Sequence, residues 1–209
     1  MAHGGGLDKQ GGHNNRKTGE YHCHREPCLS THSQTQDELK TATPSSYRSL
    51  YSRKEWPHWV DGDNDCQSTR HELLIATSNR PVNFKDSRKC TVVLGEWYDV
   101  YTGKTFTRAS DLDIDHIVPL AHAHRSGAAN WSRGQKRIFA NDPVNLIVVD
   151  DSTNQSKSDK APHEWMPPRQ GYWCTYIAKW VEVKEKYKLS SSANELAKIE
   201  QTRLNCQYI

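Results

Sequence analysis

The 209-residue sequence has no long apolar run and no marked excess of charge of one sign. No segment approaches the ~18 apolar residues of a membrane-spanning helix, so we expect no association with membranes. The first residues, MAHGGGLDKQ, lack the apolar centre of a signal peptide, and we expect none within this sequence. The 28 Lys and Arg against 25 Asp and Glu give a net charge of only +3. This balance is too mild to indicate a polyanionic partner by itself.

Two further signatures are missing. Without a GxxxxGKS or GxxxxGKT loop, no nucleotide cofactor is expected. The six cysteines do not form the paired CxxC motifs of a structural zinc site. Their even number, with only two Met, favours disulfides and a secreted or periplasmic mature protein. Spacing alone cannot choose the pairing. We favour neighbours in sequence, because each bond would brace one local unit: Cys23–Cys28, Cys66–Cys90 and Cys174–Cys206. The alternative is six reduced, buried cysteines in a cytosolic protein.

Composition divides the chain into three segments. Residues 1–32 are rich in Gly and His and too poor in aliphatic side chains to form a core. Residues 33–46 are a polar linker, and residues 47–209 have the composition of one globular domain. Apolar periodicity in this domain predicts an α+β fold. We expect helices over 68–79, 131–142, 171–189 and 191–206, a β-hairpin over 90–108, and strands over 113–120 and 145–150. The last helix should turn Leu196, Ile199 and Leu204 toward the core.

Residues 113–160 carry the residues with the clearest chemistry. Asp115 and His116 end an apolar strand, Asn145 opens the next strand, and Asn154 is followed by Lys157. Carboxylate and amide oxygens are suited to a hard cation such as Mg²⁺ or Mn²⁺. An imidazole beside them can accept a proton from an attacking water. The pattern therefore indicates hydrolysis of a phosphodiester with one metal ion.

This window, with its DHxxP…NL…NxxK pattern, resembles the ββα-metal, or HNH, nuclease motif. The closer similarity is to HNH-like domains of secreted bacterial nonspecific nucleases and of modification-dependent restriction enzymes. It extends to WVDGDNDCQSTRHELL, LGEWYDVYTG, GAANW, FANDPVNL and WMPP, and covers about residues 47–206. The resemblance implies a ββα-metal core with a β-hairpin and C-terminal helices. It also implies that Asp115 and Asn154 hold the metal, that His116 is the general base, and that Asn145 positions it. Asn154 stands where many HNH motifs have His, which favours Mg²⁺ or Mn²⁺ over softer metals.

Several residues are weaker candidates. Arg70 could contact a phosphate, with Glu72 beside it, although a surface ion pair is an equal alternative. The acidic residues Asp61, Asp63 and Asp65 favour a turn over a calcium loop, because the distal Glu of that loop is missing. We expect His122 and His124 to be solvated.

Basic residues near the motif are expected to contact nucleic-acid phosphates without regard to base sequence. They are Lys136, Arg137, Lys157, Lys160 and Arg169. No base-reading helix or zinc finger is evident, so a monomeric nuclease with little sequence preference is expected, with DNA as substrate and RNA as a further possibility.

The amino-terminal GGLDKQGGHNNRKTGEYHCHREPC resembles a short module with a Tyr-His-x-His signature that is attached to various secreted bacterial proteins. His13, His22 and His24 could bind Zn²⁺ there, but a disulfide-pinned loop with solvated histidines is favoured. Gly12 stands where that module often has Cys, which leaves the partner of Cys23 open. Two alternatives to a secreted nuclease remain: a modification-dependent restriction nuclease, and an inactive binding protein that acts through this module.

Overall fold

The computed structural model describes residues 9, 12–14, 21–23 and 51–206. The chain divides into two compact units, Met1–Ser49 and Leu50–Ile209. In the first unit, β1 (Gly12–Asn14) pairs antiparallel with β2 (Tyr21–Cys23), and the backbone of His13 lies opposite that of His22. Residues His24 and Cys28 lie outside the described part of the chain. The Cys23–Cys28 bond and the amino-terminal metal site therefore remain predictions.

A pair of antiparallel strands followed by a helix forms the centre of the second unit. Strand β6 (Leu112–His116) pairs antiparallel with β7 (Leu146–Asp150), and α6 (Asp151–Lys157) begins directly after β7. Leu112 and Ile114 of β6 pack with residues of β7 in one apolar cluster. Because strand side chains alternate between faces, residues 113 and 115 of β6 share the opposite face. The α+β fold with a ββα core confirms the expected fold class.

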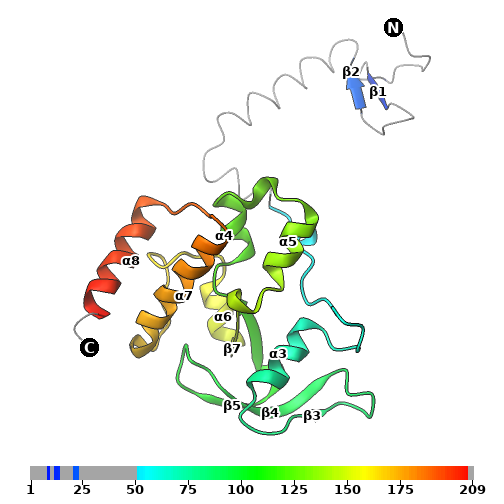
Figure 1. The fold of residues 1–209 in the computed structure, drawn as a ribbon, viewed down its shortest axis with the longest axis vertical. Helices are drawn as coiled ribbons and strands as arrows, with labels where there is room; N and C mark the ends of the chain where they lie inside the picture. The colour runs from blue at the N-terminus through cyan, green and yellow to red at the C-terminus, as the bar shows by residue number, and fades with distance from the viewer. Residues whose placement is uncertain (1–8, 10–11, 15–20, 24–50, 207–209) are drawn as a thin grey trace. The chain divides into compact units, whose positions relative to one another are not determined.

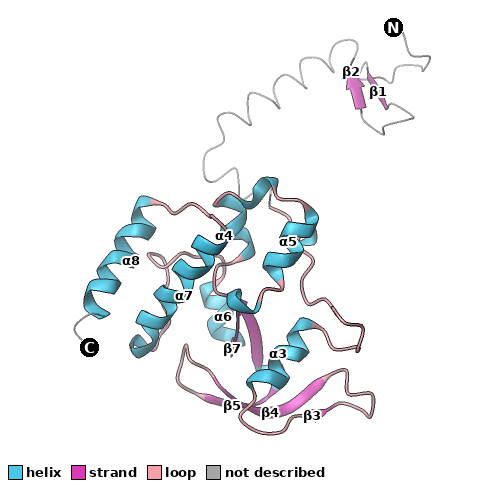
Figure 2. Cartoon of the chain, viewed as in Figure 1, coloured by secondary structure: helices cyan, strands magenta, loops and turns pink. Residues whose placement is uncertain are grey.

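A second sheet packs against this pair of strands. Its strand order is β3 (Asn83–Phe84), β4 (Val92–Tyr98), β5 (Thr105–Arg108), all antiparallel. Helix α3 (Thr69–Thr77) lies against it (Figure 2). The indole Nε1 of Trp97 donates to the carbonyl of Leu74 at 2.8 Å, which fixes helix to sheet. The disulfide Cys66–Cys90 joins the segment before α3 to the segment before β4, as predicted.

Helices make up the rest of the unit: α4 (Leu120–Arg125), α5 (Arg133–Ala140), α7 (Trp173–Lys186) and α8 (Ala193–Cys206). Short 3₁₀ turns connect elements at Arg53–Glu55, Ala128–Asn130, Pro143–Asn145 and Gln170–Tyr172, and one at Ala109–Asp111 leads into β6. A large aromatic cluster fills the space between the helices, with Trp56, Tyr101, Phe139, Tyr176 and Trp180 fully buried. No described helix has the length and apolarity needed to cross a membrane.

The two C-terminal helices lie side by side (Figure 1), and Cys174–Cys206 ties the start of α7 to the end of α8. The expected inward face of α8 is wrong in part. Leu196 and Leu204 are 55% and 48% exposed, whereas Glu195 and Ile199 are buried. Glu195 turns inward because its carboxylate accepts a hydrogen bond from the indole of Trp180 at 2.7 Å.

His122 and His124 of α4 are buried, not solvated as expected. His122 lies edge-on to Trp180 of α7, and its Nε2 is 3.0 Å from the ammonium nitrogen of Lys184. His124 packs edge-on against Tyr51. The sequence of α4 alternates polar and apolar residues without a helical apolar stripe, which is why periodicity did not indicate its burial.

Candidate active site

His116 is the last residue of β6, and its ring is held from two sides. Its Nε2 lies 2.9 Å from the carbonyl oxygen of Ala140, to which it can only donate, and the ring stacks on Trp59 with centroids 5.4 Å apart. A neutral ring that donates through Nε2 carries its free electron pair on Nδ1. Burial lowers the pKa of His116 to about 3, so the neutral ring prevails near pH 7. The imidazole is therefore oriented as a proton acceptor.

Asp115 is buried beside His116 and accepts two hydrogen bonds. The ammonium of Lys157 donates to Oδ1 at 2.8 Å, and the hydroxyl of Tyr101 donates to Oδ2 at 2.7 Å. Burial raises the pKa of Asp115 and lowers that of Lys157, and the attraction within the pair opposes both shifts. Each carboxylate oxygen has two acceptor sites, so one hydrogen bond apiece leaves room for a cation.

Lys157 was expected to contact nucleic acid, and this expectation is wrong. Its side chain has no exposed surface, because α6 directs it under β6. Besides pairing with Asp115, its ammonium donates to the backbone carbonyl of His116 at 2.8 Å. Lys157 thus fixes both neighbouring residues of the Asp-His pair.

Asp113 is a residue of this site that sequence reasoning did not single out. The amide nitrogen of Asn154, on α6, donates to its Oδ2 at 3.0 Å, and the Arg70 guanidinium lies 3.4 Å from its Oδ1. Asp113 stands two residues before Asp115, so strand alternation places both carboxylates on one face of β6. That spacing was the available signal.

Asn145 is completely buried and links the exit of β6 to the entrance of β7. Its amide oxygen accepts from the backbone NH of Val118 at 2.8 Å, and its amide nitrogen donates to the Val118 carbonyl at 3.2 Å. Its own carbonyl accepts from the NH of Ile117 at 2.8 Å. Asn145 therefore fixes the loop after His116, and the imidazole itself donates its hydrogen bond to the carbonyl of Ala140.

Part of this site lines one cavity of about 590 Å³. Its polar lining includes Asp113, Asp115, His116 and Asn154. Carboxylate and amide oxygens are the donors that Mg²⁺ and Mn²⁺ prefer, and no thiolate that would favour a softer metal is among the described residues of the lining. The residues present therefore fit a hard divalent cation.

The other basic residues differ in exposure. Lys136 is buried and pairs with Glu55 at 2.8 Å, so the expectation that it contacts phosphates is wrong. Arg137 and Arg169 are exposed, and the guanidinium of Arg169 lies over the ring of Tyr98. Lys160 is half-buried, with its ammonium donating to the carbonyl of Ser156 at the end of α6.

Arg70 pairs with Asp113 rather than with Glu72. Its guanidinium also donates to the carbonyls of Ala109 and Leu112 at 3.0 and 2.8 Å, which brace the start of β6. Glu72 faces the acidic turn that precedes α3, and burial, together with the charges of that turn, raises its pKa.

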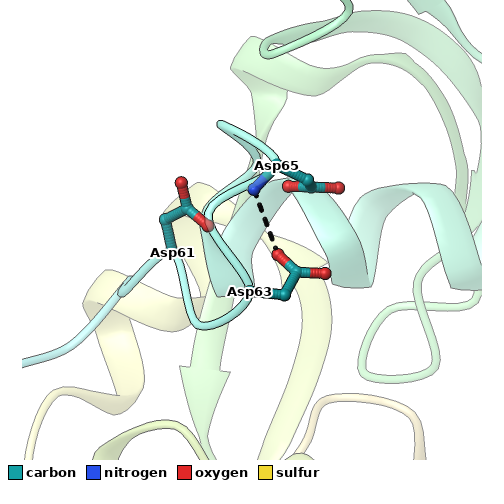
Figure 3. A group of neighbouring side chains, drawn as sticks. All are labelled: Asp61, Asp63 and Asp65. Atoms are coloured by element: carbon teal, nitrogen blue, oxygen red, sulfur yellow. Dashed lines mark hydrogen bonds between the residues drawn. The ribbon is translucent and has the colours of Figure 1, made fainter.

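The acidic turn contains Asp61, Asp63 and Asp65 (Figure 3). Asp61 accepts from the backbone NH groups of Asn64 and Cys66, and Asp65 accepts from that of Gln67. The carboxylates therefore cap backbone donors, as expected of an acidic turn.

Comparisons with known proteins assign the chain to a family. Residues 68–199 match the family of GmrSD restriction endonucleases, C-terminal domain. An uncharacterized secreted protein of Arthroderma benhamiae is 43% identical over 157 residues, covering 74% of this chain and 75% of that protein. No solved structure matches the chain. The family match spans β6, β7 and α6, together with every member of the Asp115, His116, Asn145 and Asn154 set. The chain therefore belongs to the GmrSD restriction endonuclease C-terminal domain family, a family of nucleases.

Proposed function

We propose that the protein is a metal-dependent endonuclease that hydrolyses DNA with little sequence preference, with RNA as a further candidate substrate. The observation that carries this proposal is the convergence of an oriented imidazole and three oxygen-bearing side chains on one cavity. A neutral His116 beside clustered carboxylates suits proton abstraction from water near a bound phosphate. An inactive binding protein would have no need of this arrangement.

In this mechanism, His116 is the general base. The Ala140 carbonyl accepts a hydrogen bond from Nε2–H, which stays protonated, so Nδ1 receives the proton of the attacking water. Trp59 limits rotation of the ring by stacking on it. Asn145 holds the backbone immediately after His116, and Lys157 holds its carbonyl. These contacts keep the base in one orientation before substrate binds.

Asp115 and Asn154 would hold one Mg²⁺ or Mn²⁺ ion, with Asp113 positioning the Asn154 amide. When bound, such an ion stabilises negative charge on the phosphate and on the leaving oxygen. Lys157 and Tyr101 orient the Asp115 carboxylate, since each donates to a different oxygen. Substrate phosphates beyond the cleaved bond would meet Arg137, Lys160 and Arg169, whose contacts are indifferent to base identity.

Two observations support a location for this protein outside the cytoplasm. The Arthroderma benhamiae relative is described as secreted, and two disulfides brace this chain. Disulfides persist in oxidising compartments. We therefore propose action outside the cytoplasm. A modification-dependent restriction nuclease is the second candidate, because the matched family is named for restriction endonucleases.

A plasmid-nicking assay tests the proposal. Wild-type protein should convert supercoiled plasmid to nicked and linear forms with Mg²⁺ and should stop on addition of EDTA. His116→Ala should cut about 10²–10⁴-fold more slowly while still binding DNA, since a positioned general base contributes that much. Equal cutting by His116→Ala would refute the mechanism. Cleavage restricted to DNA with modified bases would favour the restriction candidate instead.

A further inference from the structure

One wall of the active-site cavity comes from the segment 51–59, which lies before the matched family region of residues 68–199. Three of its side chains line the cavity together with His116: Tyr51, Arg53 and Trp59. The wall therefore lies outside both the ββα motif and the matched family region.

The segment is anchored firmly to the domain. Trp56 is 1% exposed and packs edge-on against Phe139. The neighbouring Glu55 carboxylate pairs with the ammonium of Lys136 at 2.8 Å. Asn141, at the end of α5, donates to the carbonyl of Pro57 at 2.8 Å and accepts from the NH of residue 60 at 3.2 Å.

Trp59 adopts a left-handed backbone conformation with φ of 56°, which bulky residues rarely adopt. Such conformations persist only where the surrounding structure enforces them, and they are enriched at functional sites. Here the conformation accompanies the stacking of the indole on the His116 ring. The segment is thus a preorganised wall rather than a loose loop.

Arg53 supplies the positive charge of this wall. It is the one Lys or Arg among the described residues that line the cavity. The three carboxylates of the lining already have basic partners: Asp113 with Arg70, Asp115 with Lys157, and Asp159 with Arg125. Arg53 is exposed and forms no ion pair with an acidic side chain in the described part of the chain. Arg53 and His116 line the same cavity.

We propose that Arg53 is a catalytic residue that donates hydrogen bonds to a non-bridging oxygen of the phosphate under attack. This inference rests on the proposed nuclease function. A phosphate entering a cavity lined by three carboxylates needs a cation on its open side, and a guanidinium offers planar, paired donors to phosphate oxygens. Because charge on these oxygens changes as the bond breaks, the contact should act mainly on kcat.

The test compares Arg53→Gln and Arg53→Lys with wild type on plasmid DNA. Arg53→Gln should lower kcat by about 10²–10³-fold, as when one donor to a developing oxyanion is removed. Arg53→Lys should recover part of this loss, since it restores the charge without the planar fork. The matched control is Arg80→Gln, at an exposed arginine outside the cavity that pairs with Glu96. Arg80→Gln should cut at the wild-type rate.

A stereochemical readout separates direct contact from an indirect effect. A labelled duplex carries one phosphorothioate of either configuration, and cleavage at that linkage is compared with cleavage at its neighbours, with Mn²⁺ as the metal. Wild type should cleave one configuration faster than the other. In Arg53→Gln the ratio of the two rates should be smaller, because the arginine no longer contacts one of the two non-bridging positions. Wild-type kcat and unchanged discrimination in Arg53→Gln would overturn the inference alone. Absence of His116-dependent cleavage by wild type would overturn the nuclease proposal as well.

Discussion

The ammonium nitrogen of Lys157 lies 2.8 Å from Oδ1 of Asp115, with the two side chains 0% and 4% exposed. Such a pair is costly to form and more costly to break, because removing one partner leaves a buried charge uncompensated. The pair joins the helix of the ββα core to the strand that carries His116. Breaking the Lys157–Asp115 pair should therefore both destabilise the fold and disturb the geometry of the site.

Replacing Lys157 with Met should destabilise the domain by about 3–5 kcal/mol, the usual cost of breaking a buried ion pair. Urea unfolding followed by tryptophan fluorescence measures this difference. Lys160→Met is the control on the same stretch of chain, because Lys160 is half-buried and its ammonium donates to a backbone carbonyl. Its effect should stay within about 0.5 kcal/mol. Equal stability of the two variants would show that the Lys157–Asp115 pair does not contribute to the free energy of unfolding.

Asn154→Ala should weaken divalent metal binding and raise the Mg²⁺ concentration that half-maximal cleavage requires. Calorimetric titration with Mn²⁺ measures the affinity independently of activity. Ser156→Ala alters an exposed side chain of the same helix and should leave the affinity unchanged. Asp115→Asn should also weaken metal binding. If both Asn154→Ala and Asp115→Asn bind Mn²⁺ as wild type does, the ligand assignment is wrong.

Sequence reasoning located the ββα core because its evidence is local. The Asp115–His116 pair, the apolar runs of β6 and β7, and the spacing to Asn154 all lie within a short window. Contacts between segments that are distant in sequence leave no such local pattern and could not be predicted. Arg53 and Trp59 reach the cavity only because Trp56 is buried among helices from elsewhere in the chain.

The same limit explains the errors among the charged residues. Basic residues near a nuclease motif suggest phosphate contacts, yet Lys136 and Lys157 are themselves buried, and each pairs with an acidic side chain more than 40 positions away. On α8, Glu195 replaces Leu196 at the interface because Lys184 and Trp180 of α7 both contact its carboxylate. Patterns of polarity along one segment do not reveal such partners.

Stability should fall in mild acid because His122 is buried in its neutral form. Burial lowers its pKa to about 4. In the unfolded chain its pKa is about 6.5, so between these values only the unfolded chain binds the proton. Folding stability should therefore decrease as pH falls from about 6.5 to about 4, by up to about 3 kcal/mol from this group. Around the ring, Lys184 and Arg125 disfavour its charged form and Glu195 favours it.

Urea unfolding at pH 7 and pH 4.5 tests this expectation. His122→Gln should show a smaller loss of stability between the two pH values than wild type. It should keep part of the loss, because His116 shifts in the same direction. His163→Gln, at an exposed position, should retain the full wild-type loss. Identical losses in His122→Gln and wild type would rule out a contribution from His122.

Reduction of the two disulfides should lower stability strongly without removing the active site. Cys66–Cys90 and Cys174–Cys206 close loops of 24 and 32 residues. In the chain-entropy model each closure stabilises by about 3–4 kcal/mol. A whole domain has a margin of about 5–15 kcal/mol, so loss of both bonds should bring this one close to unfolding. Neither bond contributes a residue to the cavity lining.

The double variants Cys66→Ser/Cys90→Ser and Cys174→Ser/Cys206→Ser separate the two contributions. Each should lower the melting temperature, yet freshly purified protein should still nick plasmid at low temperature. Reductant should lower the wild-type melting temperature by more than it lowers that of either variant, since each variant has only one of these two bonds left to lose. Titration of the native protein should find the four thiols of these pairs oxidised. Four free thiols there would contradict action in an oxidising compartment and would favour the restriction-enzyme alternative, because cytosolic proteins keep their cysteines reduced.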